Sequence, residues 1–162
     1  MAYAAPDALL LIDPLVPADL WGPLDDVRRG HGKPVVVYTT IRFHRRSRDE
    51  VQRRFGARAV RRGAGLPTAV EAIRIPRAGE TMVWLSEPRA LVPGDRLLGD
   101  DVGGLRLCPS GWLRYLEPGL THDELREALR EQLLHLPAEL VLVSHGQPVL
   151  ENGRGAIERA LS

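Results

Sequence analysis

The chain has 162 residues, of which 44% are hydrophobic and 27% charged, values typical of one globular domain spanning residues 1–162. A net charge of +1 excludes a global field that would attract nucleic acid or a membrane surface, and the single cysteine excludes an intramolecular disulfide and a cysteine-based metal cluster. The first apolar run is too short for a signal peptide or a membrane span, so we expect a cytoplasmic protein.

The first half of the chain alternates strands with helices. Short apolar runs predict buried strands over residues 7–13 and 33–40, and each is followed by a helical pattern, over 17–32 and 47–56. Strands separated by helices are typical of parallel neighbours in one sheet. This half therefore predicts an α/β sheet.

Both predicted helices of this half carry local signals. Trp21, Leu24 and Val27 are expected on one buried face of the first helix. In the second helix, Ser47 is followed three residues later by Glu50, a pattern typical of a capping box. We therefore expect the second helix to begin at Ser47.

The second half of the chain begins with three strands joined by short turns. Residues 69–76, 80–87 and 89–95 predict an antiparallel meander. The glycine-rich segment 99–120 that follows predicts an irregular loop. This half thus has a strand pattern that differs from the first.

A helix, a strand and a short helix complete the chain. Thr121 is followed three residues later by Glu124, a second capping-box pattern at the start of a helix over 121–137. A buried strand over 138–146 and a closing helix over 152–162 follow. Together with the first half, these elements predict an α/β fold.

Polar residues stand directly after two of the predicted strands. Asp95 follows the apolar run of LVPGD, and His145 follows that of LVLVSHG. Folds of the α/β class collect functional side chains at strand ends, because the rigid sheet directs them into one crevice. A carboxylate and an imidazole are also ligands of zinc, iron and manganese. The pattern predicts either a functional pair or, since Asp after Gly is common in turns, two turn residues.

The order of these segments resembles that of the metallo-β-lactamase-fold hydrolase family. The resemblance covers roughly residues 8–160 and rests on the successive segments LLLIDP, VVVYTT, RRFGA, IPRAGET, LVPGD, THDELREALREQL and LVLVSHGQPVL. In that family an aspartate-ended strand precedes a T-H-x-H-x-D-H metal motif, a G-H-T turn, a strand ending in G-D, a helix and a strand ending in H-G. The resemblance implies an αββα sandwich with metals at one edge between two sheets. It also implies a shortened opening hairpin, or a start that is not the natural one.

The metal motif of the family is largely rewritten in this chain. With Thr39 placed on the leading threonine of the motif, the first two histidine positions hold Thr40 and Arg42. The aspartate position holds His44, and the last histidine position holds Arg45. A guanidinium keeps its proton, so Arg42 opposes a cation by charge repulsion. The resemblance thus implies a degenerate member that lacks the full two-metal site.

The remaining ligand positions of the family are better preserved. Asp95 and His145 match the pattern, and Glu80 stands in GET, where histidine is usual. These two residues and His44 would suit one zinc, iron or manganese ion, with Glu80 as a further ligand or a general base. A metal-free alternative places the Arg42 guanidinium in the position of the cation, paired with Asp95 and Glu80.

Two classes of function follow from this resemblance. An active protein would be a metal-dependent hydrolase of an unknown small-molecule substrate, with at most one ion. The alternative is a non-catalytic binding or structural protein that kept the fold and lost the metals. An exposed strand edge near the start of the chain would then favour pairing of two copies as a homodimer.

Arginine is concentrated in one segment of the chain. Nine arginines lie between residues 42 and 62, against two acids. Several fall on the polar side of a predicted helix, which is typical of a solvated face. They are not interleaved with aromatic residues in the manner of proteins that stack single-stranded bases. The alternative is a site for an anionic ligand, such as a phosphate-containing molecule or RNA, since some relatives of this fold cleave RNA. The solvated face is the favoured interpretation, so we do not expect nucleic acid as a partner.

Overall fold

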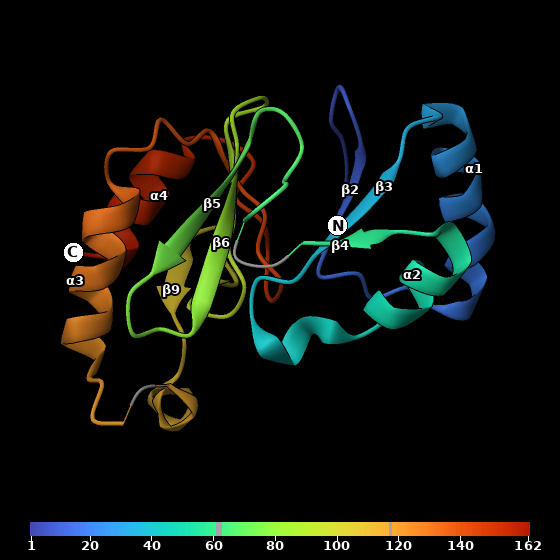
Figure 1. Ribbon diagram of the computed structural model, residues 1–162. Helices are drawn as coiled ribbons and strands as arrows, with labels where there is room; N and C mark the ends of the chain where they lie inside the picture. Colours follow the sequence, from blue (N-terminus) through green and yellow to red (C-terminus); the bar gives the residue numbers. More distant parts are fainter. Residues whose placement is uncertain (61–62, 117) are drawn as a thin grey trace. The chain divides into compact units, whose positions relative to one another are not determined.

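The computed structural model describes residues 1–60, 63–116 and 118–162 (Figure 1). The chain divides into two compact units, unit 1 spanning Met1–Val70 and unit 2 spanning Glu71–Ser162. Each unit combines a four-stranded sheet with helices, so the predicted α/β class is confirmed. One domain over residues 1–162 stays a prediction.

The sheet of unit 1 has the strand order β1-β2-β3-β4. The pair β1 and β2 is antiparallel, whereas β2, β3 and β4 run parallel, as the alternation of strands and helices predicted. The strands are β1 (Ala2–Ala4), β2 (Leu9–Ile12), β3 (Val35–Tyr38) and β4 (Arg58–Ala59). The helices are α1 (Trp21–His31) and α2 (Arg48–Phe55), and the 3-10 helices are η1 (Ala18–Leu20) and η2 (Arg42–Arg45).

The core of unit 1 lies between one face of this sheet and the helices α1 and α2 (Figure 1). Residues two apart on a strand share a face, so β2 and β3 each contribute two side chains to this core. Its buried members are Leu9, Leu11, Trp21, Val35, Val37, Val51 and Ala57. Both helices end at a glycine with positive φ, Gly32 after α1 and Gly56 after α2.

Two details predicted for these helices are wrong. Val27 is half exposed, because a position six residues after the buried Trp21 lies roughly 120° away around the helix. Ser47 is the N-cap of α2, but its hydroxyl accepts the backbone N–H of Val16 (3.0 Å) and no N–H of the helix. The capping box with Glu50 does not form, because Ser47 (φ −82°, ψ 8°) lacks the extended backbone of a capping residue and its hydroxyl contacts Val16 instead.

The sheet of unit 2 has the strand order β10-β7-β6-β5. The pair β6 and β7 is antiparallel, as the predicted meander requires, and β10 runs parallel to β7. The strands are β5 (Val70–Ile75), β6 (Glu80–Leu85), β7 (Ala90–Val92) and β10 (Leu140–Val141). The last strand is shorter than predicted, and residues 142–146 continue from it as a loop.

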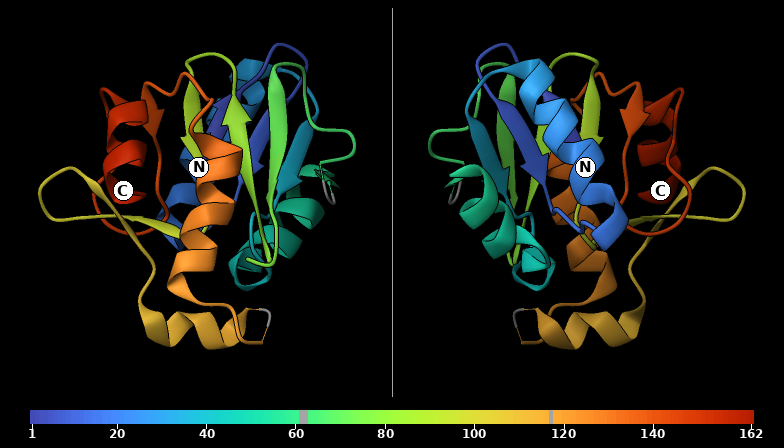
Figure 2. Two further views of the ribbon diagram at one scale, coloured as in Figure 1. Left: turned by 90° about the vertical axis from the view of Figure 1, so that its left-hand side faces the viewer. Right: turned by 90° about the vertical axis from the view of Figure 1, so that its right-hand side faces the viewer.

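The helices α3 (His122–Leu133) and α4 (Gly153–Ala160) cover one face of this sheet (Figure 2, left). The capping box of Thr121 and Glu124 is present at the start of α3, as predicted. The predicted buried stripe of α3 is fully buried; its members are Leu125, Leu129 and Leu133. Among the described residues, no helix combines the length and the apolar character that crossing a membrane would require.

The segment 99–120 is more regular than the predicted loop. An antiparallel pair forms from β8 (Leu97–Gly99) and β9 (Leu105–Leu107), and the 3-10 helix η3 (Ser110–Tyr115) follows. Asp100 organises the turn of this pair by accepting the backbone N–H groups of Val102 (3.0 Å) and Gly104 (2.6 Å). The high glycine content of this segment predicted an irregular loop. The short hairpin was not predicted because its turn depends on hydrogen bonds to the Asp100 side chain.

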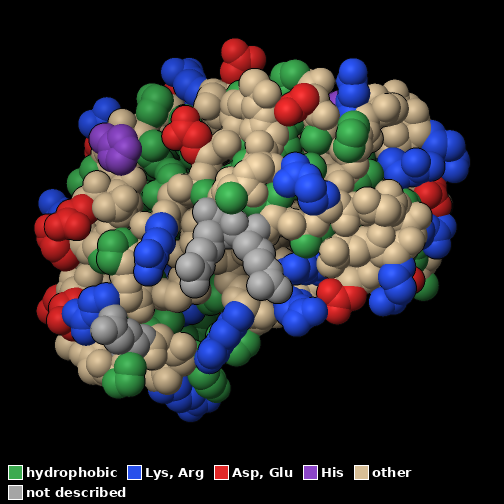
Figure 3. Space-filling view, in the orientation of Figure 1, with side chains coloured by type: hydrophobic (Ala, Val, Ile, Leu, Met, Phe, Trp, Pro, Cys, Tyr) green, Lys and Arg blue, Asp and Glu red, His purple; other side chains and the backbone are tan. Residues whose placement is uncertain are grey.

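Two side chains of the arginine-rich segment pair with acids. On the face shown in Figure 3, Lys and Arg side chains are interspersed with Asp and Glu side chains. Arg45 pairs with Asp49 (3.1 Å), and Arg54 pairs with Asp25. Of the nine arginines between residues 42 and 62, those at 61 and 62 lie outside the described residues. The pairing is consistent with a solvated face.

Candidate functional site

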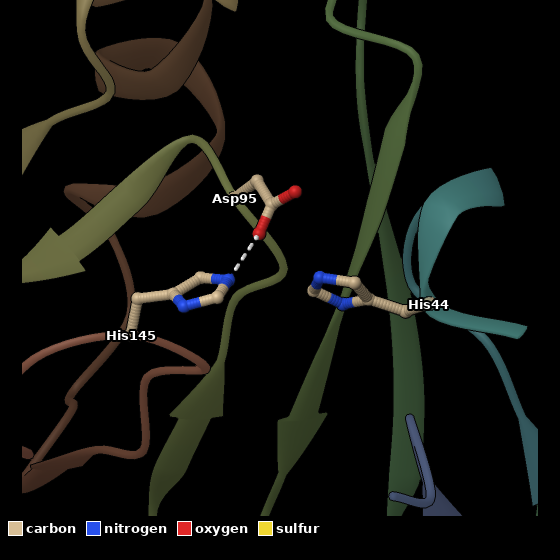
Figure 4. A group of neighbouring side chains, drawn as sticks. All are labelled: His44, Asp95 and His145. Atoms are coloured by element: carbon tan, nitrogen blue, oxygen red, sulfur yellow. Dashed lines mark ion pairs between the residues drawn. The ribbon is translucent and has the colours of Figure 1, made fainter. Parts of the chain in front are cut away.

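Asp95 and His145 lie side by side at one end of the unit 2 sheet (Figure 4). Asp95 follows β7 after two loop residues, and His145 lies in the loop after β10, which is parallel to β7. The His145 Nε2 atom is 3.4 Å from the Asp95 Oδ1 atom. The Asp95 side chain is 12% exposed and that of His145 is 49% exposed, so the pair joins a buried carboxylate to a solvent-accessible imidazole. The Trp112 ring, on η3, meets the His145 ring edge-on at 6.1 Å.

Glu80, the first residue of β6, is buried behind the loop that carries Asp95. Its Oε1 atom accepts the backbone N–H of Gly94 (2.9 Å), and its Oε2 atom accepts those of Asp95 (2.8 Å) and Arg96 (3.1 Å). The Nε atom of Arg96 lies 3.7 Å from Oε2 and donates to the carbonyl of Ala78 (3.2 Å). Both carboxylate oxygens of Glu80 thus contact the polypeptide chain.

The electrostatic environment of Glu80 contains opposing effects. Burial raises the pKa of Glu80 to about 7, whereas the N–H donors of Asp95 and Gly94 and the charge of Arg96 act to lower it. Because carboxylate oxygens that accept three N–H groups are best satisfied when ionised, these contacts favour the charged form. The role of Glu80 as a ligand or general base stays a prediction.

Two glycines join the His145 loop to strand β8. Gly99 donates its N–H to the carbonyl of His145 (2.9 Å). A Cβ atom on Gly99 would collide with the backbone of Gln147, and one on Gly146 would collide with the backbone of Gly99. Gly146 also has φ of +84°, where side chains other than hydrogen are strained. This close approach holds the His145 loop against the strand that follows Asp95.

His44 belongs to unit 1, where it hydrogen-bonds to Asp13. The His44 Nδ1 atom lies 2.8 Å from the Asp13 Oδ2 atom, and both side chains are buried. Asp13, directly after β2, also accepts the N–H of Thr40 (2.8 Å) and the Thr40 hydroxyl. A carboxylate partner at Nδ1 favours a proton on that ring nitrogen. The His44 side chain is also labelled in Figure 4.

The two residues at the first two histidine positions of the family's metal motif have other contacts. Arg42 is exposed, and its guanidinium lies over the ring of Phe43 at 4.6 Å. Thr40 is committed to Asp13, as described above. The buried cation beside Glu80 is Arg96. Glu80 therefore has its counter-charge within unit 2 and does not require the proposed pairing with Arg42.

Three features of these surroundings were missed from the sequence. Asp13 had a signal, because it ends the first strand in LLLIDP, but no role was assigned to it. Arg96 is buried, with 2% of its surface exposed, and no local sequence pattern around Asp95 predicts this burial. The contact of Gly99 with the loop of Gly146 joins two segments that are distant in the chain, so neither glycine could be singled out.

Comparisons with known proteins identify the fold. No family model matches the chain, and no curated protein matches it. Among solved structures, the mono-zinc form of an NDM_FIM-1 like metallo-β-lactamase from Erythrobacter litoralis superposes with a TM-score of 0.65 at 16% identity, over 99% of this chain and 80% of that one. The metallo-β-lactamase IND-7 gives 0.61 at 14% identity, over 99% and 83%. The di-iron-bound form of TTHA1623 gives 0.57 at 18% identity, over 96% and 90%.

These matches define the class of protein. They extend over nearly the whole chain, although the sequence identities are low. The chain is a protein of the metallo-β-lactamase fold. The family resemblance inferred from LVPGD, LVLVSHG and the order of the other segments is thereby confirmed at the level of fold.

Proposed function

We propose that the chain is a hydrolase-like protein that binds at most one metal ion, zinc, iron or manganese, through Asp95, His145 and His44. The observation that carries the proposal is the Asp95–His145 pair, which presents a carboxylate and an accessible imidazole 3.4 Å apart. Solved structures of this fold include a mono-zinc form and a di-iron-bound form. The proposal requires that the Nε2 atom of His44 contributes to the same ion.

The chemistry of the donor set fits such an ion. One carboxylate and two imidazoles are a common ligand set of catalytic zinc and non-haem iron, and they leave a coordination position open. The Nδ1 atom of His44 contacts Asp13, so Nε2 would be the ligand atom of this side chain. When bound, the ion would supply an activated water for attack on a small-molecule substrate.

A second ion has no comparable support. The family resemblance assigns three positions to the ligands of a second ion, and these positions hold Thr40, Arg42 and Glu80. Thr40 is bound to Asp13, Arg42 carries a permanent positive charge, and both oxygens of Glu80 accept backbone N–H groups. We therefore propose a single-ion centre.

Elemental analysis of protein purified without chelator tests the proposal. We expect close to one equivalent of zinc, iron or manganese, lost in His145→Ala and Asp95→Ala. His135→Ala is the matched control, because this exposed histidine follows α3 and should leave the metal content unchanged. Failure of the wild-type protein to bind zinc, iron or manganese after reconstitution would contradict the proposal.

That contrary outcome would favour the second candidate, a non-catalytic protein that kept the fold. Its specific support is that Thr40 and Arg42 stand at the first two histidine positions of the family's metal motif. Arg42 is exposed, with its guanidinium over the ring of Phe43. We expect such a protein to act through binding, including pairing of two copies. Light scattering at several protein concentrations measures this, and a monomer throughout would argue against the homodimer.

A further inference from the structure

We propose that Glu80 is a positioning residue, which together with Arg96 fixes the loop that carries Asp95, and that it is neither a metal ligand nor a general base. The inference rests on the proposed function, in which Asp95 is a ligand. It also makes a separate claim about the loop itself, which holds whether or not an ion binds.

The first argument is the convergence of three successive N–H groups on one carboxylate. Gly94, Asp95 and Arg96 all donate to Glu80, at 2.9, 2.8 and 3.1 Å. Successive backbone N–H groups that point into one concavity form an anion site. Here the anion is a side chain of the same unit, so the loop is closed around Glu80.

The second argument is that Glu80 is inaccessible. Its side chain is 0% exposed, and that of Arg96 is 2% exposed. Arg96 supplies the counter-charge at 3.7 Å and is itself anchored on the carbonyl of Ala78 (3.2 Å). A general base must reach a water or a substrate proton, and a ligand needs a lone pair directed at the ion. Both oxygens of Glu80 are instead directed at the loop.

The third argument concerns the effect on Asp95. The backbone N–H of Asp95 is fixed on Glu80, and its side chain lies 3.4 Å from His145. The His145 loop is held in turn by the contact between Gly99 and Gly146. Residues that orient a ligand in this way typically change metal affinity by about 10–100-fold when replaced. Glu80 would therefore act on the ion through Asp95.

Glu80→Gln tests the inference, because it keeps the shape of the side chain but replaces one acceptor oxygen by an NH2 group, which donates and cannot accept. Amide hydrogen exchange of Gly94, Asp95 and Arg96 is measured without metal, and the dissociation constant of Co²⁺ is measured separately. We expect at least about tenfold faster exchange for one of the three amides and at least about tenfold weaker Co²⁺ binding.

Glu124→Gln is the matched control. It makes the same chemical change at a carboxylate that accepts the backbone N–H of Thr121 (2.9 Å), in the capping box of α3. It should leave exchange at Gly94, Asp95 and Arg96, and the affinity for Co²⁺, unchanged.

The outcomes separate this inference from the proposed function. Unchanged exchange at all three amides in Glu80→Gln would overturn the inference, whatever the Co²⁺ affinity of the variant. Wild-type protein that fails to bind Co²⁺ would count against the proposed function, while the exchange measurement would still decide the role of Glu80. If Glu80→Gln does not fold, the double variant Glu80→Gln, Arg96→Met, which leaves no unpaired buried charge, takes its place with the same expectations.

Discussion

At the scale of single residues, two buried carboxylates organise the surroundings of the candidate ligands. Asp13 accepts two donors of Thr40 and contacts His44, whereas Glu80 accepts three backbone N–H groups. Burying a carboxylate is costly unless its lone pairs are used, and both residues meet this condition. Each carboxylate therefore stabilises a particular backbone path next to a candidate ligand.

Asp13→Asn should destabilise the protein. The amide nitrogen of Asn cannot accept from the Thr40 hydroxyl or from His44, so a buried donor loses its acceptor, at a cost of about 1–3 kcal/mol in the free energy of unfolding. Urea denaturation measures this. Asp7→Asn is the control, because Asp7 is exposed and accepts a single N–H from Thr68 (2.9 Å); a change within about 0.5 kcal/mol is expected there. Equal effects of the two substitutions would contradict the assignment.

Gly99→Ala should also destabilise the protein, for a steric reason. The added Cβ would meet the backbone of Gln147, which cannot move aside as a flexible side chain could. We expect a loss of about 1–3 kcal/mol in the free energy of unfolding, measured by thermal or urea denaturation. Gly111→Ala, where no heavy atom lies within 4 Å of the added Cβ, should have little effect. Wild-type stability of Gly99→Ala would contradict the prediction, because it would show that the backbone at Gln147 can move away from the added Cβ.

At the residue level, the sequence placed Asp95 and His145 directly after predicted strands. The structure pairs those strands in parallel and brings the two side chains 3.4 Å apart, whereas their role as ligands stays a prediction. The burial of Arg96 and the contact of Gly99 depend on segments far away in the chain. No local pattern encodes such contacts.

At the scale of elements, two identical capping motifs had different outcomes. The box of Thr121 and Glu124 forms, with the Glu124 carboxylate accepting the Thr121 N–H at 2.9 Å. The box of Ser47 and Glu50 does not: Ser47 has ψ of 8°, whereas Thr121 has the extended ψ of 166°, and the Ser47 hydroxyl accepts the N–H of Val16. A local motif predicts a helix start well, but its hydrogen bonds also require the backbone conformation of a capping residue. The hairpin of β8 and β9 was missed for a related reason, since its turn depends on the Asp100 side chain.

The capping box of α3 makes stability depend on pH. The Thr121 N–H, followed by Arg77 and the Thr121 hydroxyl, lowers the pKa of Glu124 from 4.5 to about 2. The unfolded chain therefore binds this proton at higher pH than the folded chain does, so the stabilisation is present above pH 4.5 and is lost as pH falls towards 2. Glu124→Gln should flatten the decline of the melting temperature over this range. The same decline in both proteins would contradict the prediction.

At the scale of the whole molecule, the charge is nearly balanced in total, and part of the arginine-rich segment is paired with acids. The net charge is +1, and the arginine-rich segment pairs Arg45 with Asp49 and Arg54 with Asp25. Paired charges at a surface contribute little to a long-range field, which salt screens further. The order of short motifs along the chain indicated the fold correctly, because it reflects the whole topology and not a single contact.

The small net charge of +1 predicts weak retention on heparin. We expect elution at or below about 0.15 M salt, where interactions beyond a Debye length of about 8 Å are screened. Arg53→Glu, at an exposed position of α2, should change the elution little. Retention well above this salt concentration, abolished by Arg53→Glu, would instead indicate a nucleic-acid-binding face.

The contact between Trp112 and His145 makes the fluorescence of Trp112 a probe of the candidate site. The indole ring lies edge-on to the imidazole, with 6.1 Å between the ring centroids, so a movement or a new ligand of that imidazole would change the surroundings of the indole. The chain has three tryptophans, and the other two, Trp21 and Trp84, are buried in the separate cores of the two units. With both replaced by phenylalanine, fluorescence would follow events at His145 in real time, without a label and without a known substrate.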